Sequence, residues 1–311
     1  MLKKTLSSIL FVTALVLVTP AVVSAQEKPP EQPNKTLAPK LTKGARIEVN
    51  GIQYHYQIRG RGEPLLLLHG GLGSVDMFGP IMPMLGAKRQ IIAVDLQGHG
   101  RTPLGSRPIS MVAMGADMSV ILKKLGYGPV DVMGYSMGAG VAFQLAAQHP
   151  QQVRRLALVS GSFAKDGFYP EMVQAQSQLS SKMAQGMKDT PMYKSYAAVA
   201  PQPGDFPKLL DAMGEMMNKP FDWSADVPKL TMPVMLIYGD SDMYRPEHVV
   251  KFYQLLGGGL KDAGWQREHM SPNRLAILPG VTHYDIFLSP QLPATVLPFL
   301  DGKATATNWV K

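Results

Sequence analysis

The sequence predicts an α/β domain built on a mostly parallel, eight-stranded sheet that is flanked by helices and carries an inserted helical cap. Two observations carry this prediction. Short apolar runs suited to buried strands alternate with amphipathic stretches suited to helices, and this rhythm stops at residues 163–226 before it resumes. With 45% apolar and 17% charged residues, the 311-residue chain can bury a sizeable core.

The N-terminus has the pattern of a secretory signal. Lys3 and Lys4 precede an apolar run at residues 9–18, and Val23 and Ala25 occupy the two positions that define a cleavage site. We expect cleavage after Ala25 and a periplasmic or secreted protein. A membrane anchor is the alternative, but the run is short for a span of about 20 residues. No stable membrane insertion is therefore expected once residues 1–25 are removed.

Residues 26–44 are expected to form a linker, because prolines are interspersed among polar residues in a stretch that is too polar to pack. The sheet then begins with a hairpin. Residues 47–49 and 52–58 alternate around Asn50-Gly51, which is the strongest short-range signal for a hairpin turn.

A central parallel strand is expected at residues 64–68, which are apolar on both faces. A glycine-rich loop follows at residues 69–73. The N–H groups of such a loop can form half of an oxyanion hole, which stabilises the charge that develops in acyl transfer. Phosphate binding is the alternative, but the spacing matches neither the dinucleotide-binding pattern nor a Walker loop. His69 is interpreted as a buried histidine that shapes this loop.

The following elements alternate as a parallel α/β sheet requires. We expect helices near residues 75–85, at 110–125 and after residue 138, and strands at residues 90–94, 129–133 and 155–160. After the break at residues 163–226, the pattern predicts strands at residues 234–238 and 274–278, helices at 246–256 and 290–300, and a long connection at 257–273.

These elements divide the chain into a core of residues 45–162 and 227–302, a cap of residues 163–226, and a C-terminal tail of residues 303–311. The cap segment is rich in methionine and aromatic residues. Methionine adapts to irregular apolar surfaces, so a methionine-rich cap suits an apolar pocket. For most of these side chains individually, ordinary packing between cap helices is the simpler interpretation.

Residues 134–138, Gly-Tyr-Ser-Met-Gly, lie between a predicted strand and a predicted helix. A serine on such a sharp turn is typical of a nucleophile elbow, in which glycines make room for a strained backbone. The alternative is a serine that merely caps the helix. A serine nucleophile needs a base to take its proton and a third group to orient that base.

Composition excludes several other classes of site. The chain has no cysteine, which rules out disulfides, thiolate metal sites and cysteine nucleophiles. Its net charge of +8 comes from scattered lysines and arginines, whereas a nucleic-acid surface needs them on one face. We expect no cofactor, no metal and no nucleic-acid partner; the pattern leaves the oligomeric state open.

Five motifs in this order resemble the α/β-hydrolase superfamily, specifically its capped serine hydrolases of the esterase and lactonase type. They are His69-Gly70-Gly71, residues 95–100, the turn at 134–138, residues 239–242 and residues 280–283. The resemblance covers residues 46–300 and follows the chain order serine, acid, histidine of that family.

The resemblance implies specific roles. Ser136 is the expected nucleophile, His283 its base and Asp242 the acid that orients the base, while the amides of Gly71 and Met137 form the expected oxyanion hole. Asp240 is the rival acid, although the family pattern favours the second aspartate of the pair.

The remaining candidates are less suited to these roles. Asp131 lies inside a strand before the turn, and no other histidine follows a late strand. The other histidines are His55, His69, His99, His149, His248 and His269.

We therefore expect a carboxylesterase (EC 3.1.1) that acts on a small to medium, largely apolar ester through an acyl-enzyme intermediate. C–C bond hydrolysis, lactone hydrolysis and amide hydrolysis on the same triad are alternatives. Tyr135 stands where C–C hydrolases usually have asparagine, and Gly71 where aryl esterases usually have an aromatic residue. A non-catalytic binding protein is less favoured, because no member of the triad is missing.

Overall fold

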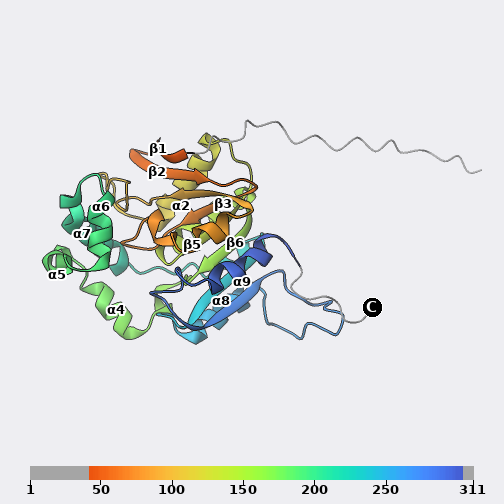
Figure 1. Ribbon diagram of the computed structural model, residues 1–311. Coiled ribbons are helices and arrows are strands. Elements are labelled where there is room, and N and C mark those ends of the chain that lie inside the picture. The colour runs from red at the N-terminus through yellow and green to blue at the C-terminus, as the bar shows by residue number, and fades with distance from the viewer. Residues whose placement is uncertain (1–41, 304–311) are drawn as a thin grey trace, which may run out of the picture. The chain divides into compact units, whose positions relative to one another are not determined.

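The structure is a computed structural model that describes residues 42–303 (Figure 1). The predicted signal, residues 26–41 of the predicted linker and residues 304–311 lie outside the described residues. Strand β1 begins at Thr42, so residues 42–44 belong to a strand and not to the linker. The reason is the hairpin: Thr42 is paired with Ile58, which extends the pairing beyond the alternating stretch.

Eight strands form one sheet in the order β1-β2-β4-β3-β5-β6-β7-β8. The β1–β2 and β2–β4 pairs are antiparallel and the rest are parallel, which confirms the predicted mostly parallel sheet. The strands are β1 Thr42–Val49, β2 Ile52–Arg59, β3 Glu63–Leu68, β4 Arg89–Val94, β5 Val130–Tyr135, β6 Val153–Val159, β7 Val234–Ser241 and β8 Arg274–Thr282.

The first hairpin forms as its turn sequence predicts. Asn50 and Gly51 have φ values of 51° and 81°, in the left-handed region that tight two-residue hairpin turns require. Val49 pairs with Ile52 across this turn. The antiparallel edge of the sheet is thus fixed by local turn chemistry.

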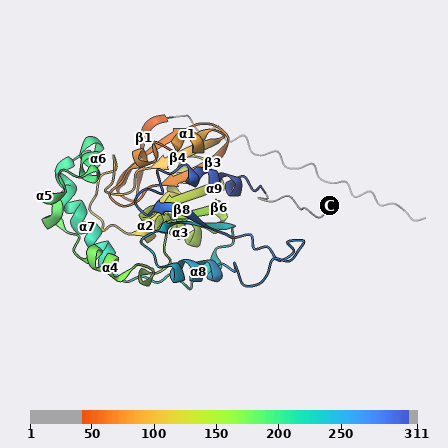
Figure 2. The same cartoon turned by 60° about the horizontal axis from the view of Figure 1, so that its bottom comes forward.

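Helices cover both faces of the sheet (Figures 1 and 2). Alternate residues of a strand point to opposite faces, so Leu66 and Leu68 of β3 enter one apolar cluster while Leu65 and Leu67 enter the other. The first cluster lies under α2 Met111–Lys124, α3 Met137–Gln148 and α8 Pro246–Leu255, and the second under α1 Met82–Gly86 and α9 Gln291–Leu300.

One predicted helix is broken. Residues 75–85 form a 3-10 turn, η1 Val75–Phe78, and then the short helix α1. Pro80 lacks the N–H that a continuous helix would use at that position, and the interruption lies at Gly79-Pro80.

Residues 163–226, the predicted cap segment, contain four α-helices. Figures 1 and 2 show them together at one side of the sheet. Within the segment, α7 buries its apolar side, which includes Leu209, Leu210 and Met213. These helices are α4 Pro170–Ser177, α5 Ala184–Met187, α6 Pro191–Val199 and α7 Phe206–Asn218.

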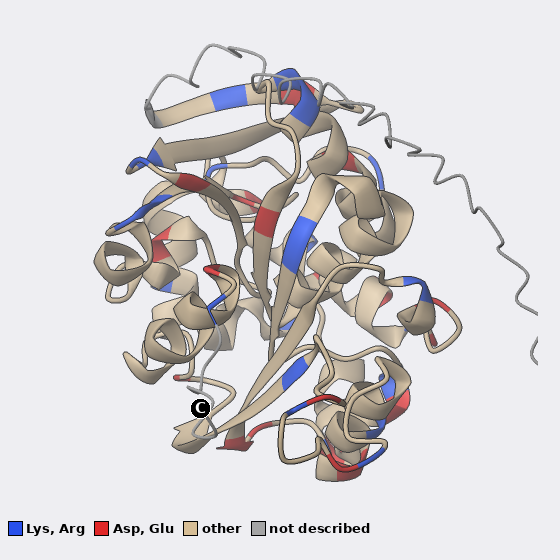
Figure 3. Cartoon of the chain, turned by 90° about the vertical axis from the view of Figure 1, so that its right-hand side faces the viewer, with Lys and Arg blue, Asp and Glu red and all other residues tan. Residues whose placement is uncertain are grey.

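Figure 3 shows lysine and arginine positions interspersed with acidic ones along the chain, without a single basic stripe. In residues 42–303 no helix has the length and apolar character needed to cross a bilayer.

Candidate active site

Ser136 sits between β5 and α3 with φ 54° and ψ −118°, a backbone conformation that non-glycine residues rarely adopt. The flanking glycines make the turn possible. A Cβ on Gly134 would lie 2.1 Å from the carbonyl oxygen of Gly138, and one on Gly138 would lie 2.4 Å from that of Leu68. The predicted turn is therefore the one that the chain forms.

The structure brings Ser136, His283 and Asp242 together at the carboxyl ends of three strands. Ser136 Oγ lies 3.0 Å from His283 Nε2, and His283 Nδ1 lies 2.9 Å from Asp242 Oδ1. Asp242 can only accept, so Nδ1 carries the proton and Nε2 is left to accept from the serine hydroxyl. The side chains of His283 and Asp242 are 5% and 3% exposed, which shields their interaction from solvent.

The carboxylate of Asp242 is held from several sides. Ser160 Oγ donates to Oδ2 at 2.5 Å, and the amides of Gly239 and Met243 donate to Oδ2 and Oδ1 at 3.3 and 2.8 Å. These donors fix the orientation of the carboxylate that faces His283. Sequence reasoning missed Ser160. The only feature that could have indicated Ser160 was its place at the end of the strand next to β7.

Tyr135 has a role that its position in the motif does not predict: it positions the loop that carries His283. Its hydroxyl donates to the backbone carbonyl of His283 at 2.6 Å. Burial, together with the charge of Asp242, raises the pKa of Tyr135 well above its usual value. The hydroxyl therefore stays protonated and able to donate. Its ring also packs 5.3 Å from that of His283, centroid to centroid.

Gly71 lies on the loop after β3, and Met137 follows Ser136 at the first position of α3. Gly138 packs directly against the backbone of Leu68 and His69, which brings the start of α3 against this glycine loop. Within residues 42–303, neither the Gly71 nor the Met137 amide donates to a protein acceptor. Both amides remain available to a ligand.

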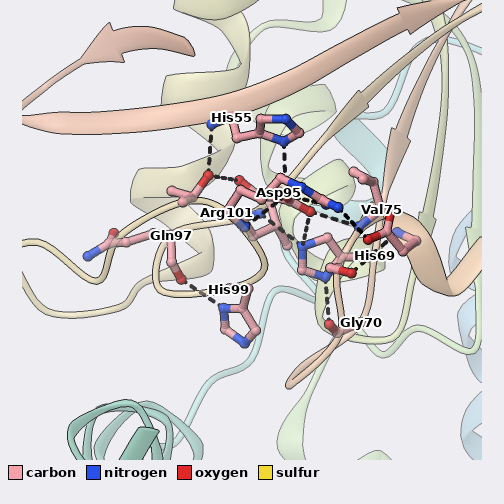
Figure 4. A network of polar contacts seen from close by, with 12 residues as sticks. His55, His69, Gly70, Val75, Asp95, Gln97, His99 and Arg101 are labelled. Carbon is pink, nitrogen blue, oxygen red and sulfur yellow. Dashed lines mark hydrogen bonds and ion pairs between the residues drawn. The ribbon is translucent and has the colours of Figure 1, made fainter. Parts of the chain in front are cut away.

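A buried polar network around Asp95 contacts the glycine loop at His69 and Gly70 (Figure 4). Asp95 accepts from His55 Nδ1 at 3.0 Å, from the Val75 amide at 2.7 Å and from the Arg101 amide at 2.9 Å. Burial alone would raise the pKa of Asp95, but the hydrogen bonds from these donors lower it on balance. The carboxylate thus ties β2, η1 and the loop after β4 together.

His69 shapes the glycine loop, as its position predicts. Its Nε2 accepts from the Leu96 amide at 2.9 Å, so the proton lies on Nδ1, which donates to the Gly70 carbonyl at 2.7 Å. Burial lowers the pKa of His69 and keeps the ring neutral. The 4.0 Å approach to Asp95 is therefore not a charged pair.

The other two candidate acids, Asp240 and Asp131, bind parts of the protein other than His283. Asp240 accepts from the Gly280 amide at 2.9 Å and so connects β7 to β8. Asp131 is fully buried between Arg89 and Arg154, at 2.6 and 2.9 Å. Neither carboxylate has a contact with His283 in the described part of the chain.

Of the seven histidines, His283 is the one that contacts Ser136. His55, His69 and His99 belong to the network of Figure 4, and His149 is the C-terminal cap of α3. His269 is exposed in the long connection at residues 257–273. His248, on α8, contacts Ser162. In residues 42–303, no group of three or more acidic and histidine side chains is arranged to hold a metal ion.

Comparison with known proteins agrees with this fold. The model of a family described as "alpha/beta hydrolase fold" matches residues 63–190. A pimeloyl-[acyl-carrier protein] methyl ester esterase from Neisseria meningitidis serogroup B is 40% identical over 108 residues, which are 34% of this chain and 40% of that protein. The first curated relatives are matched over only 35 to 43% of their own length.

Solved structures match over more of the chain. E-2-(acetamidomethylene)succinate hydrolase has a TM-score of 0.65 at 20% identity, covering 83% of this chain and 98% of that one. The carboxylesterase CesB from Bacillus subtilis has a TM-score of 0.63 at 17% identity, covering 86% and 94%. At this identity the likeness concerns the fold. Together with the family match over residues 63–190 and the sheet order, it shows that the chain has the α/β-hydrolase fold.

Proposed function

We propose that this protein is a serine hydrolase that cleaves a carboxylic ester of a small to medium, largely apolar substrate. The observation that carries the proposal is the unbroken hydrogen-bonded sequence from Ser136 through His283 to Asp242. It gives a hydroxyl nucleophile, a base within reach of its proton and a carboxylate that stabilises the resulting imidazolium.

In the proposed mechanism, Ser136 Oγ attacks the ester carbonyl carbon while His283 Nε2 takes the hydroxyl proton. The Gly71 and Met137 amides donate to the oxyanion that forms; each such donor typically contributes about 10²- to 10³-fold to the rate. His283 returns the proton to the leaving alcohol, which leaves an acyl group on Ser136. Water activated by the same histidine then releases the acid and restores the serine.

The surroundings of the glycine loop support an apolar acyl group. The methyl carbon of Met213, on α7, lies 3.0 Å from the position that a Cβ on Gly71 would take. Leu209, on the same helix, lies equally close to a Cβ position on Gly98, in the loop after β4. Apolar side chains from the cap segment thus lie directly over the loops beside Ser136.

The names of related proteins favour an ester. One relative is a methyl ester esterase and one fold neighbour a carboxylesterase. Lactone, amide or C–C bond hydrolysis would use the same three side chains, so these activities form the second panel of substrates.

We also propose that residues 1–25 direct the protein to the periplasm or outside the cell; N-terminal sequencing of the recovered protein tests this.

The test is hydrolysis of p-nitrophenyl esters from acetate to decanoate by wild type and by Ser136→Ala. We expect activity at short or medium chain length and a loss of about 10⁶-fold in kcat for the variant, with an unchanged circular dichroism spectrum. A variant that retains near wild-type activity contradicts the proposed mechanism. Activity on lactones or amides but not on esters contradicts only the proposed substrate class.

A further inference from the structure

A cavity lies apart from Ser136, between the sheet and the broken helix that follows the glycine loop. Its volume is about 400 Å³, within the range of small-molecule sites. Residues from β2, β4, η1 and α1 line it, and none of them belongs to the triad. The break at Gly79-Pro80 borders the cavity, and Gly60, Gly79 and Gly86 are among its lining residues.

The walls of the cavity include several apolar side chains and one side-chain amide. Val75 and Ile91 are 3% and 1% exposed, and Met82 and Pro83 close the side formed by α1. Gln57 also lines the cavity and is only 4% exposed. Within residues 42–303 its side-chain amide has no hydrogen-bond partner in the protein, so its polar atoms can bond to solvent or to a ligand.

A guanidinium group lies at the rim of the cavity. Side chains two residues apart on a strand share a face, so Arg59 follows Gln57 on the same face of β2. Arg59 is exposed and has no ion-pair or hydrogen-bond partner in the described part of the chain. The other charge at the rim, Asp76, is already paired with Arg101 at 2.7 Å. The uncompensated charge at this cavity is therefore positive.

We propose that this cavity is a second binding site, for a small molecule that combines a carboxylate with a short apolar body. The carboxylate pairs with Arg59, whose planar fork matches its two oxygens. The amide of Gln57 donates to the same group or to a neighbouring carbonyl, and the apolar body contacts Val75, Ile91 and Met82. The site does not depend on ester hydrolysis at Ser136.

The test is an NMR titration of the uniformly ¹⁵N-labelled protein with hexanoate, and with hexanamide as its uncharged counterpart. We expect saturable shifts of the Gln57, Met82 and Ile91 amides with hexanoate, and weaker binding of hexanamide. Arg59→Ala should weaken hexanoate binding by at least about tenfold, because a charge-assisted pair is lost. Arg61→Ala is the matched control: Arg61 is exposed in the bend that follows β2, two residues after Arg59, but does not line the cavity.

A second variant fills the cavity without removing a charge. A Cβ on Gly86 would lie 3.7 Å from Ile91 Cγ1, an ordinary contact, so the Gly86→Leu side chain starts towards the cavity without a clash at its Cβ. It should abolish the hexanoate shifts at Gln57 and Ile91. The proposal is overturned if Arg59→Ala binds hexanoate as wild type does, if hexanamide binds equally well, or if hexanoate shifts only residues around Ser136.

Discussion

His248 is a buried histidine outside the triad that connects the start of the cap segment to α8. The hydroxyl of Ser162 donates to the Ala164 carbonyl, so His248 Nε2 donates to Ser162 Oγ, at 2.9 Å. The imidazole stacks on Phe163 at a centroid distance of 4.1 Å, and Gly167 packs against its edge. A neutral imidazole with its proton on Nε2 can make this hydrogen bond, so the ring does not need to be charged.

The charges around His248 favour that neutral form on balance. Burial lowers its pKa to about 4, with Arg245 and Lys251 also lowering it and Asp166 and Asp222 opposing them. The folded state therefore binds fewer protons than the unfolded state between about pH 6.5 and pH 4. Stability is fully present above the unfolded pKa and is lost as the pH falls through this window.

We predict that the free energy of unfolding decreases from pH 6.5 to pH 4.5, and that His248→Gln makes this decrease shallower. The contribution of His248 is at most about 3 kcal/mol. Urea denaturation at several pH values measures it, with His269→Gln, at an exposed histidine, as the control. His99, whose pKa burial lowers to about 3, is present in both variants and adds the same pH dependence to each. Equal pH slopes for His248→Gln and wild type contradict the prediction.

At the scale of elements, α7 lies over the loops beside Ser136. Met213 is fully buried on its inner side, and its methyl group lies against Gly71. The size of this side chain limits the space beside Gly71, which borders the proposed acyl site.

We predict that Met213→Ala shifts the preferred p-nitrophenyl ester to a longer acyl chain, because it removes atoms next to Gly71. The same change should cost about 2 to 5 kcal/mol of stability, since it leaves a cavity. Met216→Ala, partly buried on the same helix, is the control and should leave the chain-length profile unchanged. An unaltered profile in Met213→Ala shows that Met213 does not line the acyl site.

The sequence predicts the strands well because buried parallel strands are apolar runs, and it predicts the first hairpin because Asn50-Gly51 has a specific turn chemistry. It does not predict the break at Gly79-Pro80, because the periodicity of residues 75–85 outweighs the proline in a pattern analysis. It also places the end of the linker too late, since pairing with β2 draws Thr42 into the sheet.

The candidate site is predictable where a residue follows a strand in a recognisable motif. Ser136, Asp242 and His283 satisfy that condition, and the structure brings them together, while their catalytic roles stay proposals. Ser160 and the hydroxyl of Tyr135 do not satisfy it. Their contacts with Asp242 and the His283 carbonyl depend on which strands become neighbours, and periodicity carries no information on that.

At the scale of the whole molecule, opposite ends of the sheet hold different polar clusters. Ser136, Asp242 and His283 lie at the carboxyl ends of the strands, and a buried ionic network lies near their amino ends. Arg89, 2% exposed, pairs with Asp131 and with Asp301, at the end of α9. Arg154 pairs with Asp131 and Glu63, so the network joins β3, β4, β5, β6 and α9.

We predict that Arg89→Met lowers the free energy of unfolding by about 3 to 5 kcal/mol, because it leaves the buried Asp131 with only one cationic partner. The ester-hydrolysis rate of the folded variant should be unchanged, since the triad is at the other end of the sheet. Glu63→Gln, which breaks an exposed pair, should cost less than about 1 kcal/mol. Thermal and urea denaturation compare the two; similar losses contradict the assigned role of Arg89.

The most direct test of the central claim, that His283 activates Ser136, is covalent labelling with a fluorophosphonate followed by intact-mass and peptide mass spectrometry. Wild type should gain one phosphonyl group, on Ser136, and Ser136→Ala should gain none. His283→Gln should react more slowly by about 10²-fold or more, because the hydroxyl has lost its base. Labelling that persists in Ser136→Ala, or a wild type that does not react, contradicts the account.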